Sequence, residues 1–121
     1  MRFSLLVLAG SALGGLARFW LGAWMVVVAG PDFPWGTLLI NVAGSLLIGL
    51  AATAIPVSSD AARAFVIVGL CGGFTTFSAY SLQTLELLQA DRIPAALAYM
   101  AASVAACLAA TWLGWVLGRV A

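Results

Sequence analysis

The hydrophobic residues of this chain fall into four long runs that cover residues 4–28, 35–56, 64–88 and 95–120. Each run is close to the roughly 20 apolar residues that an α-helix needs to cross a bilayer. Short segments rich in proline and polar residues separate the runs, as is typical of turns between helices. The pattern predicts an all-α membrane protein with four transmembrane helices, forming one four-span domain over residues 1–121.

The beginning of the chain also resembles a secretory signal peptide, because Arg2 precedes an apolar run that contains small residues. The apolar pattern resumes after Arg18, however, and three further runs follow it. We therefore expect residues 4–28 to remain as the first membrane span.

The composition agrees with a protein surrounded by lipid. Hydrophobic residues make up 64% of the chain and charged residues 7%, whereas soluble domains carry about 25% charged residues. The net charge of +1 offers no basic surface for nucleic acid. Histidine is absent, and no nucleophile accompanied by a base is apparent, so the sequence does not indicate an enzyme.

The arginines say little about orientation. With four spans, Arg2, Arg63 and Arg119 face one compartment, while Arg92 and, nearer that side, Arg18 face the other. Arginine bias between short loops normally orients a membrane protein. A bias of three against two favours insertion in both orientations and pairing as an antiparallel dimer. The alternative is that a single arginine suffices to orient every copy.

Small residues and one arginine recur at every fourth position of the first run: Gly10, Gly14, Arg18 and Gly22. Positions four apart share one face of a helix, and glycines on such a face favour close packing against a neighbouring helix. A guanidinium within a span is costly unless it reaches the interface or finds partners. Arg18 therefore either extends to the interface or anchors a polar network.

The second and fourth runs carry polar rows with the same spacing, namely Thr37, Asn41 and Ser45, and then Tyr99, Ser103, Cys107 and Thr111. The amide of Asn41 would be unsatisfied against lipid. It either joins two helices by hydrogen bonds, which the second run alone favours, or donates into a polar path. The hydroxyls of the fourth run either bond to carbonyls of their own helix or line a track.

The third run contains the most unusual segment, GGFTTFSAYS at residues 72–81. Paired glycines followed by β-branched threonines continue a helix poorly. Unwound backbone at membrane depth is tolerated only where protein or a water-filled cavity satisfies its polar groups, and such breaks form ion sites in transporters. The segment predicts a break near the middle of the third helix, with a continuous helix packed through its glycines as the alternative.

Three motifs resemble the Fluc fluoride channels, also called CrcB proteins. The first is GSALGGLARFW at residues 10–20, the second is GTLLINVAGS at residues 36–45, and the third is the segment 72–81. They occur in order, and the resemblance covers essentially the whole chain. It implies a fluoride-selective channel in the cell (inner) membrane that lets fluoride leave passively and relieves fluoride toxicity.

The resemblance also implies a dual-topology antiparallel homodimer with two pores and a structural sodium ion between the subunits. Carried onto this sequence, the backbone carbonyls of Gly72 and Thr75 would bind the sodium ion. The fluoride pore would be lined by these residues: Asn41, Phe77, Ser78, Tyr80, Tyr99, Ser103 and Thr111. Their donors are neutral amides, hydroxyls and ring edges, which can replace the water around fluoride without binding it as tightly as a fixed cation would.

Three positions depart from the family pattern. Tyr80 stands where a second phenylalanine is usual, Ala79 where a hydroxyl is usual, and Gln83 where a glutamate is frequent. Tyrosine keeps an aromatic ring edge, so we expect the first change to preserve conduction. Ala79 removes a donor, and Gln83 leaves the role of Glu86 open.

Two other functions compete with the channel. A small proton-coupled multidrug exporter also has four helices and is sometimes inserted in both orientations, but it needs a carboxylate within the membrane. The first two runs have none, and Glu86 and Asp91 lie at or beyond the end of the third. In a non-transporting assembly subunit, the glycines and Asn41 would serve only to pack helices.

Overall fold

The computed structural model describes residues 1–121 and consists of helices joined by short loops. The elements in chain order are α1 (Arg2–Ala29), α2 (Trp35–Ala54), α3 (Asp60–Arg63), the π-helical segment η1 (Ala64–Cys71), α4 (Gly72–Phe74), α5 (Phe77–Gln89) and α6 (Ile93–Val120). Elements α3 to α5 follow one another as the interrupted third span. The four predicted spans are confirmed, because four helical stretches are long and apolar enough to cross a membrane.

Some helix ends differ from the predicted boundaries, and proline accounts for two of them. The second helix ends at Ala54 rather than at residue 56, because Ile55 precedes Pro56 and adopts an extended conformation, as residues before proline tend to do. The fourth helix begins earlier than predicted, at Ile93, with Pro94 in its first turn. Proline is tolerated there because the first helical N–H groups have no partner in the helix.

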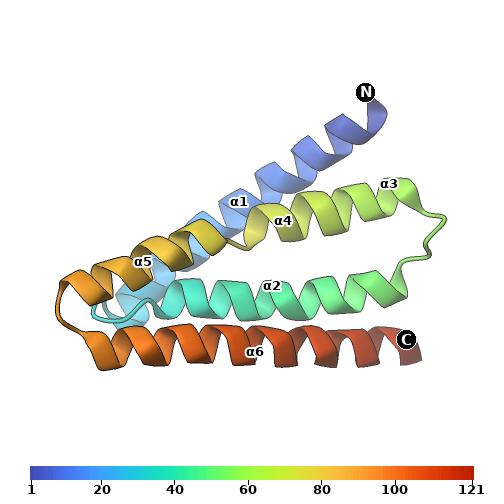
Figure 1. Ribbon diagram of the computed structural model, residues 1–121. Coiled ribbons are helices and arrows are strands. Elements are labelled where there is room, and N and C mark those ends of the chain that lie inside the picture. The colour runs from blue at the N-terminus through green and yellow to red at the C-terminus, as the bar shows by residue number, and fades with distance from the viewer.

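Both chain termini and the α2–α3 loop lie at one end of the molecule, and the α1–α2 and α5–α6 loops lie at the other (Figure 1). Helices α2 and α6 run side by side. Helix α1 packs against η1 and α4, while its N-terminal part leans away from the rest of the bundle (Figure 1). The third span therefore contacts α1 through its first half, and α5 approaches α6 after the break.

Glycines allow two of these helix pairs to meet backbone to backbone. A Cβ atom on Gly14 of α1 would lie 2.7 Å from the backbone nitrogen of Phe74. A Cβ atom on Gly114 of α6 would lie 2.8 Å from the backbone nitrogen of Leu50 in α2. Real Cβ atoms do not approach backbone this closely, so a side chain at either position would push the helices apart. The close neighbour predicted from the glycines of the first run is present.

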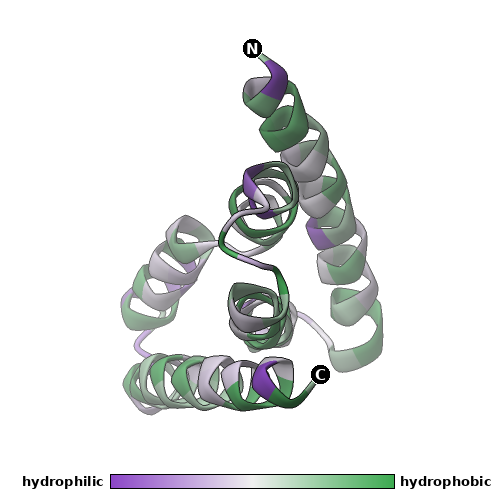
Figure 2. Ribbon diagram, turned by 90° about the vertical axis from the view of Figure 1, so that its right-hand side faces the viewer, coloured by the Kyte–Doolittle hydropathy of each residue, from purple (hydrophilic) through white to green (hydrophobic).

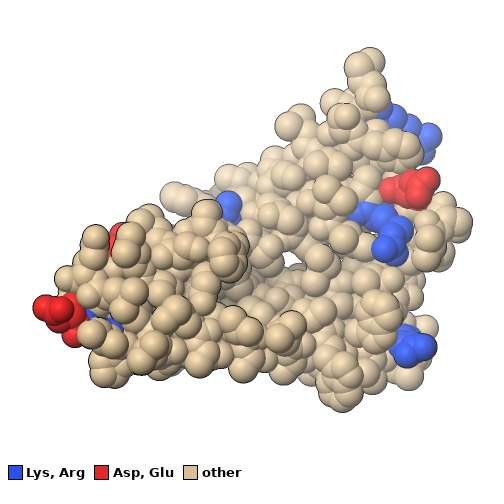
Figure 3. Space-filling view, viewed as in Figure 1, with Lys and Arg blue, Asp and Glu red and all other residues tan.

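The surface of the single chain is largely apolar. Only 16 of 121 residues are buried, and hydrophobic residues extend along every long helix (Figure 2). Charged residues gather at the two ends of the molecule, with one arginine patch between them on the face shown (Figure 3). This distribution suits helices that face lipid or another subunit at mid-depth and water at both ends.

Candidate functional site

The third span is interrupted at Thr75 and Thr76, which are both extended, with φ/ψ of −81°/159° and −152°/114°. The backbone N–H and the hydroxyl of Thr75 both donate to the carbonyl of Cys71, at 3.0 and 2.9 Å, and so close the helix before the break. The hydroxyl oxygen of Thr76 accepts from the N–H of Ala79 at 3.1 Å and caps α5. Both threonines thus satisfy a helix end, and the predicted break is confirmed.

The amide of Asn41 in α2 binds the backbone of Thr76 twice. Its nitrogen donates to the Thr76 carbonyl at 3.0 Å, and its oxygen accepts from the Thr76 N–H at 2.8 Å. The side chain satisfies the two backbone groups in the way that a neighbouring strand would. Asn41 is therefore a joint between α2 and the break, and one N–H of its amide is left for other partners.

The side chain of Arg18 in α1 also reaches the break. Its Nε donates to the carbonyl of Gly73 at 3.2 Å, and the residue is half-buried. In an unbroken helix that carbonyl would accept from Phe77, the residue at which α5 begins. Of the two alternatives for Arg18, the structure has the polar contact within the protein.

The carbonyls of Gly72 and Thr75 also lack their ordinary helical partners. The N–H of Thr76, which would serve the Gly72 carbonyl in a continuous helix, donates to Asn41 instead. The carbonyl of Thr75 accepts no hydrogen bond from the protein. Gly72 is exposed and Thr75 half-buried, so the break offers oxygen ligands of the type that hard cations prefer.

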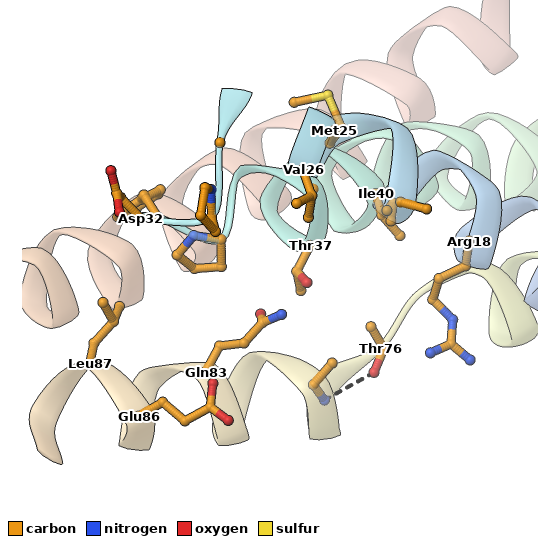
Figure 4. Close-up of a pocket in the computed structure, with 18 of the residues that line it drawn as sticks. Arg18, Met25, Val26, Asp32, Thr37, Ile40, Thr76, Gln83, Glu86 and Leu87 are labelled. Atoms are coloured by element: carbon orange, nitrogen blue, oxygen red, sulfur yellow. Dashed lines mark hydrogen bonds between the residues drawn. The ribbon is translucent and has the colours of Figure 1, made fainter. Parts of the chain in front are cut away.

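Two cavities adjoin the break. Cavity 1, of about 660 Å³, extends from Arg18 and Thr76 to the α1–α2 loop. Figure 4 shows Thr37 of α2 and Gln83 of α5 facing each other across it, with Glu86 one turn beyond Gln83. It therefore has Arg18 near the break, and Asp32, Glu86 and Arg92 toward the end of the molecule.

Cavity 2, of about 370 Å³, lies between α2, the break and α6. None of its lining residues is charged: they are Asn41, Gly44, Ser45, Ile48, Thr75, Thr76, Phe77, Tyr80, Ser103, Val104 and Cys107. The hydroxyl of Ser103 is buried and has no hydrogen-bond partner in the protein. The cavity thus brings together four of the seven pore residues expected from sequence: Asn41, Phe77, Tyr80 and Ser103.

The other three expected pore residues do not line cavity 2. Tyr99 is fully buried, and its hydroxyl donates to Oε1 of Gln83 at 2.9 Å. Ser78 is exposed, with its hydroxyl 3.3 Å from that of Thr76. Thr111 is half-buried farther along α6. The polar row of the fourth span is therefore not one continuous lining in a single chain.

Aromatic rings continue from cavity 2 to the α1–α2 loop. The rings of Phe77 and Tyr80 lie 5.3 Å apart, those of Tyr80 and Tyr99 lie 5.2 Å apart, and Phe33 meets Tyr99 edge to face at 5.5 Å. Phe77 nevertheless remains 78% exposed. An apolar ring this exposed beside a polar break indicates a surface that another molecule or lipid covers.

Sequence reasoning did not assign Thr76 or Gln83 to the site. Threonine is a common residue at the N-terminal end of a helix, so the cap could have been found once the break was located. The Tyr99–Gln83 bond joins residues of different helices, and no spacing within one helix predicts it.

The sequence is similar to a known protein family. The family profile described as "CrcB-like protein, Camphor Resistance (CrcB)" matches residues 5–115. This chain belongs to the CrcB family. A CrcB relative from Methylocella silvestris, named fluoride-specific ion channel FluC, is 50% identical over 115 residues, which cover 91% of this chain and 88% of the relative.

Further relatives carry the same name. The FluC protein of Rhizobium meliloti is 47% identical over 122 residues, covering 98% of each chain. That of Paramagnetospirillum magneticum is 48% identical over 120 residues, covering 95% of this chain and 94% of the relative. These names describe channels and not enzymes, in agreement with the expectation from sequence. The CrcB family and the four apolar helices together identify a multi-pass membrane protein.

Proposed function

We propose that this protein is a fluoride channel through which fluoride leaves the cell passively across the inner membrane. The observation that carries the proposal is cavity 2, whose lining is uncharged and combines amide, hydroxyl and aromatic groups at the break. The FluC names of the relatives supply the identity of the ion.

The lining suits a small anion. Asn41 retains one N–H, and Ser103 has a hydroxyl without a partner, so both can donate to an ion that has lost water. The ring edges of Phe77 and Tyr80 carry partial positive charge. Since no arginine or lysine lines cavity 2, an anion would be held weakly enough to leave again.

We propose further that two copies pair in opposite orientations and enclose two pores. The exposed ring of Phe77 and the exposed Gly72 support this, because a second copy would cover both. The near-even distribution of arginines supports insertion in either direction. Ser78, Tyr99 and Thr111 would join the pore through the partner or through side-chain movement.

The carbonyls of Gly72 and Thr75 fit a monovalent cation, since the break deprives both of their helical donors. A structural sodium ion held by these oxygens from both copies would neutralise the dipoles of the break without a buried carboxylate.

Fluoride efflux from liposomes that contain the purified protein, followed with a fluoride electrode, tests the function. Fluoride should leave much faster than chloride. Equal release of both ions, or release of neither, would contradict the proposal. Uptake of protons coupled to a lipophilic cation would instead support a multidrug exporter.

A substitution at Phe77 tests the place of the pore. Phe77→Ile removes the ring edge while keeping an apolar side chain, so fluoride flux should fall at least about tenfold, the effect of losing roughly 1.4 kcal/mol of transition-state stabilisation. The oligomeric state in detergent should not change. Leu82→Ile, at another exposed apolar position on α5, is the control. Unchanged flux in Phe77→Ile would remove this residue from the pore.

A further inference from the structure

The two cavities share one lining residue, Thr76. On one side of it, cavity 1 carries charged side chains, with Arg18 beside the break. On the other side, cavity 2 is uncharged throughout. Thr76 is therefore the residue at which the two cavities adjoin within a single chain.

The N–H, the carbonyl and the hydroxyl oxygen of Thr76 all form hydrogen bonds. Its N–H and carbonyl are both bound to Asn41, at 2.8 and 3.0 Å, and its hydroxyl oxygen accepts from the N–H of Ala79 at 3.1 Å. The peptide groups at this point cannot rotate unless Asn41 releases them. Because the backbone of Thr76 is fixed by these hydrogen bonds, the proton of its hydroxyl group is the part of the residue that can still change its direction.

That proton belongs to a pair of hydroxyls. The oxygens of Thr76 and Ser78 are 3.3 Å apart, and either can be the donor. Each hydroxyl has one proton, so their mutual bond uses one and leaves the other free, whichever residue donates. Ser78 lines neither cavity. When Ser78 donates to Thr76, the proton of the Thr76 hydroxyl is free to act as a neutral hydrogen-bond donor where the two cavities adjoin.

We propose that Thr76 is the threshold of the ion pathway, the point at which a small anion passes from cavity 1 to cavity 2, and that its hydroxyl, with Ser78 as hydrogen-bond partner, binds the anion as it passes. The inference rests on the proposed fluoride function and assigns to Thr76 a direct role in permeation beyond capping α5. The ligand is a compact anion that accepts strong hydrogen bonds.

Three substitutions separate permeation from capping. Thr76→Ser keeps the cap and the hydroxyl, so fluoride flux in liposomes should remain near the wild-type rate. Thr76→Val removes the hydroxyl that lies where the two cavities adjoin, and flux should fall about tenfold or more, as expected for the loss of a hydrogen bond to a charged group. Thr76→Asp keeps a strong capping acceptor but places negative charge at the threshold, and flux at neutral pH should fall at least as far.

Thr84→Val is the matched control. Thr84 lies on the same helix, is buried, and donates its hydroxyl to the Tyr80 carbonyl at 2.8 Å, but it lines neither cavity. This variant should conduct like the wild type. Every variant is first compared with the wild type by size-exclusion chromatography.

A purely structural role for Thr76 predicts that Thr76→Asp conducts normally, because its cap is intact. Wild-type flux in Thr76→Asp or in Thr76→Val would overturn the threshold assignment, even if the wild type is a fluoride channel. If Thr76→Val fails to assemble, the contrast between Thr76→Ser and Thr76→Asp decides the question. Absence of fluoride flux in the wild type would instead contradict the proposed function itself.

Discussion

The amide of Asn41 forms hydrogen bonds with both backbone groups of Thr76. These two hydrogen bonds explain why an asparagine is present in an apolar span. An aspartate has the same shape but no amide donor, so it would turn an oxygen toward the Thr76 carbonyl. Leaving that carbonyl unsatisfied costs about 1–3 kcal/mol. The arrangement depends on the chemistry of the side chain rather than on its size.

Asn41→Asp should therefore lower both thermal stability in detergent and fluoride flux. Ser45→Ala, one turn further along the same helix face, is the control and should leave stability nearly unchanged. If Asn41→Asp kept wild-type stability and flux, the hydrogen bonds between Asn41 and Thr76 would not be needed to stabilise the break.

Helix α1 supports the broken span by close contact as well as through Arg18. Gly14 lies against the backbone of α4, and a Cβ atom there would be 2.7 Å from the Phe74 nitrogen. Gly15, the next residue, has no atom within 4 Å of the corresponding position. Two adjacent glycines of one helix thus have opposite tolerance for a methyl group.

Gly14→Ala should destabilise the protein by about 1–3 kcal/mol, as overpacking does, because the backbone of α4 has to move. Gly15→Ala should be neutral or slightly stabilising, since alanine favours helix by about 1 kcal/mol over glycine. Thermal unfolding in detergent measures both. Equal stability of the two variants would contradict the packing described for α1 and α4.

At each end of the molecule, the side chain of one arginine forms hydrogen bonds with backbone carbonyls at or next to a loop. Arg63 donates to the carbonyls of Ala52 and Ile55, at 3.4 and 3.2 Å, and so satisfies the C-terminal end of α2. Arg92 donates to the carbonyl of Asp32 and joins the two loops at the other end. These arginines hold the bundle together and, at the same time, contribute to the charge balance between its ends.

Added arginines should disturb that balance. A variant with Ser58→Arg and Ala62→Arg, two exposed positions at the end that holds the chain termini, should insert in one orientation and show no fluoride flux when expressed alone. Arginines at Gln89 and Ala90, exposed at the opposite end, should fix the other orientation. Co-expression of the two variants should restore flux, whereas full flux from either variant alone would contradict the antiparallel pair.

The sequence predicts the four spans and the break, because both follow from local properties: apolar length, glycine and β-branched residues. It leaves open whether Asn41 joins helices or donates into a path, since the answer depends on which backbone faces it. The Tyr99–Gln83 bond and the place of Thr76 between two cavities depend on contacts between helices. The π-helical η1 before the break has no evident signal in the sequence pattern.

The partners of the break come from parts of the chain that are synthesised before it. Arg18 and Asn41 precede the groups that they bind by 55 and 35 residues. Peptide groups without hydrogen-bond partners are unfavourable in hydrocarbon. Because the N-terminal part of a chain is synthesised first, the first two helices can already be inserted in the membrane when residues 72–77 enter it. The order of residues along the chain thus lets the interrupted segment enter a bilayer in which its hydrogen-bond partners are already present.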